Sequence, residues 1–157
     1  MLRKKLLIVD KGAKKTGKST AVKEVIRLLK DVYMLHPEPI DEDDKFEETD
    51  VACVFTPNGV KIGIESCGDP GPRLPNTLSQ FVDKYNCDII LCASRTKGEI
   101  MDAIKSKKEK YTLLYAPHYF EEDNLDSAFV TSLNARYARN IVEIMLEWIA
   151  RHRPIFC

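Results

Sequence analysis

Short apolar runs and amphipathic stretches alternate along this chain of 157 residues. Leu6 to Val9 are continuously apolar, which is typical of a strand buried on both faces of a parallel sheet. Apolar residues then recur at helical spacing from Ala21 to Leu29, with charged residues on the opposite face. The pattern predicts a buried strand followed by an amphipathic helix that ends near Lys30.

The remaining chain continues this alternation. Val51 to Phe55 and Val60 to Ile64 flank the segment 56–59, whose Asn-Gly pair suits a tight hairpin turn with positive φ. The other predicted strands are 32–35, 88–93 and 111–116, and the other predicted helices are 78–85, 100–107 and 126–152. The buried stripe expected on the last helix is Leu133, Tyr137, Ile141, Ile144, Trp148 and Ile149. Prolines at 37 and 39 disfavour regular structure after the short 32–35 strand.

This alternation predicts an α/β fold in a single domain that spans residues 1–157. We expect three layers, α/β/α, in which helices cover both faces of a mostly parallel sheet and the β-hairpin adds an antiparallel edge.

Composition and charge limit the kinds of partner expected for this chain. Lys and Arg (24) balance Asp and Glu (24), so no global positive field gathers nucleic acid or an anionic membrane. The apolar run after the basic N-terminus is too short for a signal sequence or a membrane span. The five cysteines lack the spacing of zinc or redox motifs and are expected to be reduced and mostly buried. We expect a cytoplasmic protein with no membrane or nucleic-acid partner.

A phosphate-binding pattern joins the first strand to the first helix. Gly12 to Ser19 read G-A-K-K-T-G-K-S, which matches G-x-x-x-x-G-K-S. Gly12 and Gly17 permit a turn that wraps backbone N–H groups around phosphate oxygens, where side chains would collide with the ligand. The helix N-terminus that follows favours anions, Lys18 adds a point charge for the β and γ phosphates, and the Ser19 hydroxyl suits Mg²⁺.

Over Leu6 to Leu29 the sequence resembles the P-loop NTPase superfamily, and beyond that region the similarity is topological. The resemblance implies a P-loop NTPase type of fold, a nucleoside triphosphate with Mg²⁺ as cofactors, and a catalytic role for Lys18. The residues expected to bind the nucleotide are Gly12, Ala13, Lys14, Lys15, Thr16, Gly17, Lys18, Ser19 and Thr20.

Such proteins also carry an acidic residue near the metal, and two positions in this sequence are candidates for it. Glu65 ends a predicted strand and Gly68 follows, which resembles the D-x-x-G switch of small GTPases with Glu in place of Asp. Asp69 begins D-x-x-P-R, which resembles the D-G-F-P-R segment of adenylate kinases and would give Arg73 a phosphate to contact. Both acids are candidate catalytic residues, and Glu65 is the candidate metal ligand beside Ser19.

Further polar residues are candidates for binding or structural roles. Arg95 and Lys97 follow a strand on the ligand side of a parallel sheet, and S-R-T-K-G-E resembles the T-K-x-D motif of GTPases. Arg95 is therefore a candidate for stabilising transferred phosphate charge. Asp10 either faces the site or caps the turn, and Asp88 is read as structural. The three histidines lack ligand spacing and receive no role, and the lysines of 105–110 are read as a solvated helix end.

Two function classes fit these residues. The first is an enzyme that binds ATP (or GTP) and Mg²⁺ and acts as an NTPase or a phosphotransferase. The second is a nucleotide-controlled module that binds a protein partner through the acidic 41–50 loop or the 65–73 turn. Substituted carboxylates in both GTPase-like motifs favour ATP over GTP.

Overall fold

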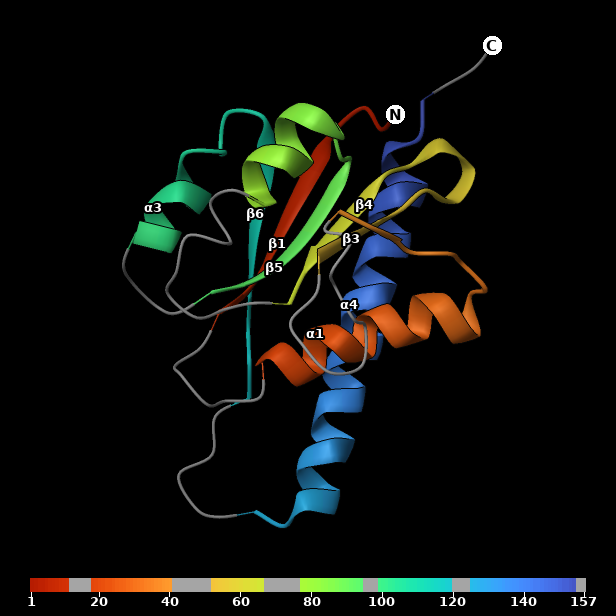
Figure 1. Cartoon of the computed structure of the whole chain (residues 1–157), viewed down its shortest axis with the longest axis vertical. Coiled ribbons are helices and arrows are strands. Elements are labelled where there is room, and N and C mark those ends of the chain that lie inside the picture. The colour runs from red at the N-terminus through yellow and green to blue at the C-terminus, as the bar shows by residue number, and fades with distance from the viewer. Residues whose placement is uncertain (12–17, 41–51, 67–76, 95–98, 120–124, 155–157) are drawn as a thin grey trace.

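The computed structural model describes residues 1–11, 18–40, 52–66, 77–94, 99–119 and 125–154, and only the backbone of Lys18, Ser19, Glu99 and Ile100. These residues form a mixed α/β fold around a six-stranded, mostly parallel sheet (Figure 1). The strands are β1 (Lys5–Lys11), β2 (Glu38–Pro39), β3 (Ala52–Phe55), β4 (Ile62–Glu65), β5 (Ile89–Ser94) and β6 (Tyr111–Pro117). Their order is β2-β3-β4-β5-β1-β6, so β1 lies between β5 and β6 and is parallel to both.

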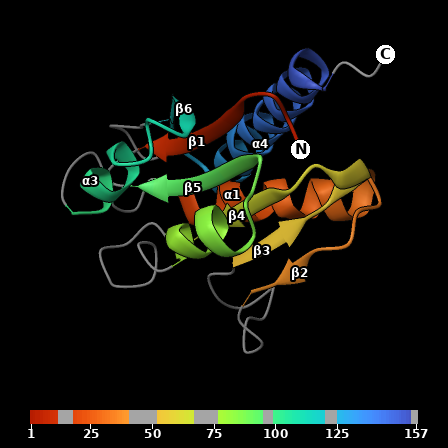
Figure 2. The ribbon, with the colours of Figure 1, turned by 90° about the horizontal axis from the view of Figure 1, so that it is seen from above.

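Helical segments cover both faces of this sheet (Figures 1 and 2). They are α1 (Lys18–Arg27), its π-helical continuation η1 (Leu28–Val32), the 3₁₀ turn η2 (Pro57–Gly59), the π-helical η3 (Gln80–Lys84), α3 (Glu99–Lys105) and α4 (Ser127–His152). α1 and α4 pack together on one face, whereas η3 and α3 lie on the other. Among the described residues, no helix is long and apolar enough to cross a bilayer.

Alternation along the strands builds one core on each face. In β1, Leu6 and Ile8 join the core beneath α1 and α4, whereas Leu7 and Val9 join the core beneath η3 and α3. All four side chains are buried, as expected for a central strand of a parallel sheet. Gly63 of β4 shows how closely the second core is packed, since a Cβ there would lie 2.8 Å from ring carbons of Phe81.

The predicted hairpin is confirmed. Phe55 of β3 pairs with Ile62 of β4 in an antiparallel ladder. Between them Asn58 (φ 51°) and Gly59 (φ 80°) adopt the left-handed conformation that the Asn-Gly pair predicted. The predicted strands 88–93 and 111–116 and the final helix are confirmed within one residue at most ends. Asp126 caps that helix by accepting a hydrogen bond from the Phe129 amide at 2.8 Å.

The predicted strand 32–35 is wrong. Leu28 and Leu29 are buried in the core, so the helical backbone continues through η1 to Val32. Met34 then adopts a positive φ of 58°, which ends the helix and reverses the chain. The strand forms later, at β2, and β2 rather than the hairpin is the edge of the sheet. Pro39 is tolerated there because an edge strand leaves one side without ladder hydrogen bonds.

Asp88 has the structural role that its position predicted. Its buried carboxylate accepts hydrogen bonds from the Leu2 amide at 2.8 Å and from the Lys61 amide at 3.0 Å. These bonds join the N-terminal segment, the start of β4 and the start of β5 at the amino edge of the sheet.

We expect Asp88→Ala to lower the free energy of unfolding by about 2–4 kcal/mol, because the buried Leu2 amide and the partly buried Lys61 amide lose their acceptor. Urea denaturation of wild type, Asp88→Ala and the exposed control Asp83→Ala measures this cost. A loss below about 1 kcal/mol would mean that water replaces the carboxylate at both amides.

Candidate functional site

The candidate site lies where the carboxyl ends of β4, β5, β1 and β6 meet. These four strands are parallel, so their ends share one edge of the sheet. In the register of the sheet, Asp10 of β1 lies level with Ala93 of β5 and Ala116 of β6. Five polar residues end or follow these strands in buried positions, namely Asp10, Glu65, Ser66, Ser94 and His118. Buried polar groups in such number at one edge indicate a functional surface.

The phosphate-binding pattern leads into this edge. Gly12 to Gly17, which include Ala13, Lys14, Lys15 and Thr16, lie outside the described residues. The backbone of Lys18 and Ser19 begins α1, and the exposed Thr20 lies in its first turn. That turn contains no acidic residue, so nothing within it opposes an anion at the positive end of the helix. Ala21 and Val22 are fully buried and fix this end of α1 against the sheet.

Glu65 ends β4 as predicted, and it is fully buried. Its neighbour in the sheet is Cys92 of β5. Burial, followed by the negative charges of Glu65 and Asp10, raises the pKa of the Cys92 thiol, which therefore stays protonated. Gly63, two residues before Glu65, faces Phe81. Because side chains alternate along a strand, the Glu65 side chain points to the face of the sheet that η3 covers.

The Asp10 side chain points to the opposite face of the sheet. It follows the alternation of Leu6 and Ile8, whose side chains lie beneath α1 and α4. The Asp10 carboxylate is fully buried, and its Oδ2 lies 3.2 Å from Nδ1 of His118. Its Oδ1 is buried without a hydrogen-bond partner, the one such side-chain atom in the described part of the chain. A buried carboxylate oxygen without a donor is costly, so this atom is suited to accept a hydrogen bond from a ligand.

His118 holds Asp10 in place from the end of β6. Its Nε2 lies 3.1 Å from Oδ1 of Asn134, a buried residue of α4. Its backbone amide donates to the Lys11 carbonyl at 3.0 Å, which fixes the segment beside β1. The ring also packs against Tyr137, with 4.8 Å between ring centroids. Both ring nitrogens face side-chain oxygens, so the orientation of the imidazole is fully determined.

Tyr137 completes the surroundings of this pair. Its hydroxyl donates to the Ala116 carbonyl at 2.6 Å. Burial and then the charge of Asp10 raise the pKa of Tyr137, so its hydroxyl remains a donor at all physiological pH values. β1, β6 and α4 are thereby joined by one buried polar network: Asp10, His118, Asn134 and Tyr137.

The other predicted site residues can be placed only in part. Asp69, Arg73, Arg95 and Lys97 lie outside the described residues. Across the residues that are described, no group of three or more His, Cys, Asp or Glu side chains is arranged to hold a metal ion. Asp10 and Glu65 are separated by strand β5 and leave the sheet on opposite faces, so they do not form one carboxylate pair.

Sequence reasoning missed His118 and Asn134. His118 was given no role because it has no neighbouring ligand in sequence, and its partner Asp10 is 108 residues away. Two signals were present: His118 directly follows a strand at the carboxyl edge, and Asn134 is a polar residue on the buried side of a helix. The expected stripe contained Leu133, which is only partly buried, in place of Asn134.

Comparisons with known proteins found no match. No protein-family model, no curated protein and no solved structure matches this chain.

Proposed function

We propose that this chain has a P-loop NTPase type of fold, binds a nucleoside triphosphate with Mg²⁺, ATP preferred, and acts as an NTPase or a phosphotransferase. The observation that supports the proposal most directly is the position of the motif. Lys18 of G-A-K-K-T-G-K-S begins α1, the first helix after the central strand β1, whose residues Leu6 to Asp10 are buried. Open parallel sheets bind ligands at the carboxyl edge.

The residues at this edge suit the ligand in complementary ways. The amides of 12–19 and the N-terminus of α1 would bind the phosphates. Lys18 would contact the β and γ phosphates, and Thr20 would contact the α phosphate. Mg²⁺ prefers oxygen ligands and keeps several waters, so the Ser19 hydroxyl with a water held by Glu65 is a suitable donor set. The ion neutralises charge on the phosphates when it is bound.

Asp10 supplies the second acidic group in this proposal. Its unpartnered Oδ1 would accept a hydrogen bond from the nucleophile, which is a water in an NTPase or a hydroxyl in a phosphotransferase. His118 and Asn134 act as positioning residues, because they fix Oδ2 and leave Oδ1 for the ligand.

A thermal-shift series tests nucleotide binding. A ligand that binds only the folded protein raises its melting temperature, so ATP, GTP, ADP and AMP can be ranked with and without Mg²⁺. We expect the largest shift with ATP and Mg²⁺. If no nucleotide shifts the melting temperature at saturating concentration, the chain does not bind nucleotides and the proposal fails.

Glu65→Gln tests the acid at the end of β4. We expect turnover to fall by at least about tenfold, because loss of a well-placed carboxylate costs more than about 1 kcal/mol of barrier. Steady-state phosphate release measures the rate, and Asp69→Asn serves as the matched acid-to-amide control with little expected effect. If Asp69→Asn and Arg73→Ala abolish turnover while Glu65→Gln does not, the metal-organising acid is Asp69.

Absence of turnover has its own interpretation. Should purified protein bind ATP but convert no nucleotide with any acceptor, ATP-dependent protection of residues 41–73 from hydrogen exchange would identify a nucleotide-controlled binding module. The function would then be partner binding through the 41–50 or 65–73 segment.

A further inference from the structure

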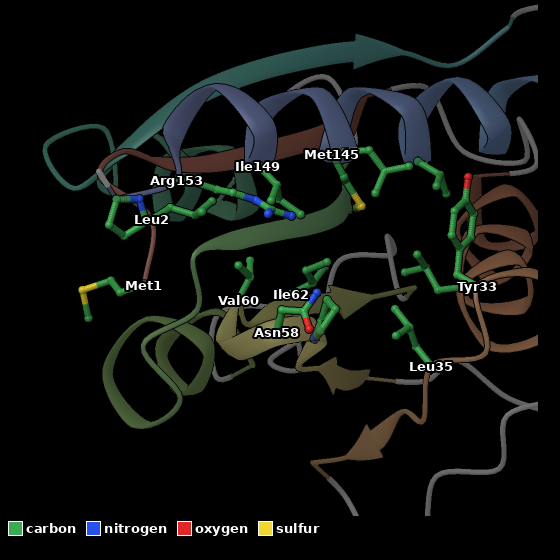
Figure 3. Close-up of a pocket in the computed structure, with 15 residues that line it drawn as sticks. Met1, Leu2, Tyr33, Leu35, Asn58, Val60, Ile62, Met145, Ile149 and Arg153 are labelled. Carbon is green, nitrogen blue, oxygen red and sulfur yellow. The ribbon is translucent and has the colours of Figure 1, made fainter. Parts of the chain in front are cut away.

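A second concave site lies at the amino edge of the sheet, opposite the edge where α1 begins. It has a volume of about 440 Å³, within the range of small-molecule sites. Residues from the N-terminus, from η1 and the segment that follows it, from the β3–β4 hairpin, and from the last three turns of α4 and the residues after it line the pocket (Figure 3). None of these residues belongs to the network of Asp10 and His118.

The floor of this pocket is apolar. Leu2, Ile62, Val142 and Met145 are almost completely buried and form its floor. An apolar cavity of this kind favours an apolar ligand.

The rim adds exposed apolar surface and a strained turn. Met1, Tyr33 and Leu146 line the pocket and are 67%, 43% and 42% exposed, large values for such side chains. Tyr33 and Leu35 flank Met34, whose positive φ of 58° is unfavourable for a residue with a Cβ. That turn directs two apolar side chains toward the pocket, and strained backbone of this kind is found at ligand clamps.

Arg153 is the single charged side chain among the residues that line the pocket. It follows α4, and in Figure 3 it extends into the pocket beside Ile149, on the side that faces Val60. Its guanidinium makes no ion pair or hydrogen bond with the described part of the chain. Asn58, held in the left-handed conformation at the hairpin tip, adds an amide to the same pocket.

We propose that this pocket binds a small amphipathic carboxylate, with its apolar chain on the floor and its carboxylate on Arg153. A guanidinium binds a carboxylate through two parallel hydrogen bonds, and the Asn58 amide would supply a further donor. The concave shape, the apolar floor and a guanidinium without a partner among the described residues together favour this class of ligand over a neutral lipid or a cation. The proposal does not depend on nucleotide binding.

The test uses decanoate, below its micelle-forming concentration, and decanol as the neutral comparison. Isothermal titration and melting temperature are measured for wild type, Arg153→Gln and Arg151→Gln, the last being an exposed arginine of α4 outside the pocket. We expect decanoate binding to weaken about tenfold in Arg153→Gln, as loss of a charge-assisted hydrogen bond predicts. Decanol binding and Arg151→Gln should stay within about twofold of wild type.

A second pair of variants tests the location. Leu146→Glu places a carboxylate at the rim and should abolish decanoate binding, whereas Leu125→Glu, at similar exposure outside the pocket, should not. The proposal is overturned if wild type does not bind decanoate, or if both leucine variants lose binding equally. It is also overturned if sedimentation shows a dimer that Leu146→Glu dissociates, because a second copy then covers the pocket. Decanoate binding only after removal of residues 155–157 would assign the pocket to that segment instead.

Discussion

We expect Lys18→Ala to remove most of the proposed affinity for nucleoside triphosphates while the fold is retained. A hydrogen bond to a charged group contributes about 1.5–3 kcal/mol, so we expect ATP to bind roughly 10–100-fold more weakly. The fold is expected to persist because Lys18 is the first residue of α1, where alanine has high helix propensity. Titration of a fluorescent ATP analogue measures the affinity, and the melting temperature without ligand measures the fold.

Lys23→Ala is the matched control, because Lys23 belongs to the same helix but not to the phosphate-binding motif. Its affinity for ATP should stay within about twofold of wild type. Equal affinity in Lys18→Ala and wild type would show that any phosphate site lies elsewhere on the chain.

We expect Asp10→Asn to abolish most of the proposed turnover without loss of nucleotide binding. Removal of a positioned general base lowers turnover by about 10²–10⁴-fold, and we expect the lower end of this range. Asparagine keeps the shape of the side chain and an oxygen that can accept from His118, so the local structure should survive. Phosphate release under single-turnover conditions measures the chemical step, and equilibrium titration measures ATP affinity.

Two further variants separate a catalytic role from a structural one. Tyr111→Phe removes a buried hydrogen bond to the Cys87 carbonyl, outside the network of Asp10, so it should cost about 1–3 kcal/mol of stability but leave turnover within a few-fold. His118→Ala should slow turnover less than Asp10→Asn, because His118 acts by positioning Asp10. If Asp10→Asn destabilises the fold strongly while folded molecules keep wild-type turnover, the pair is a structural bridge between β1 and β6.

Local patterns in the sequence predicted most individual elements. The apolar run of β1, the amphipathic repeats of α1 and α4 and the Asn-Gly turn each depend on neighbouring residues, so the sequence carries them directly. The strand 32–35 was mispredicted because its apolar residues also continue a helix, and burial of Leu28 and Leu29 against α4 decided between the two. Such tertiary contacts are not visible in a short window of sequence.

The candidate site was predicted unevenly for the same reason. The positions of Glu65 and Asp88, at the carboxyl and amino edges of the sheet, could be predicted because strand ends identify the two edges of a parallel sheet. The strand order could not be assigned, so it was not evident that β5 separates β4 from β1. The pairing of Asp10 with His118 depends on β6 lying beside β1, a neighbour relation that no local pattern contains.

Helix α4 contributes residues to both candidate sites, at opposite edges of the sheet. Asn134 near its start holds His118, and Ile149 near its end lines the apolar pocket, within one continuous helix of 26 residues. Such a helix is about 39 Å long and moves largely as one body. If both proposed ligands bind two positions of α4 with different affinity, each ligand must change the affinity for the other by the same factor. Measured together, the affinities for decanoate and for ATP would show whether this helix couples the two edges of the sheet thermodynamically.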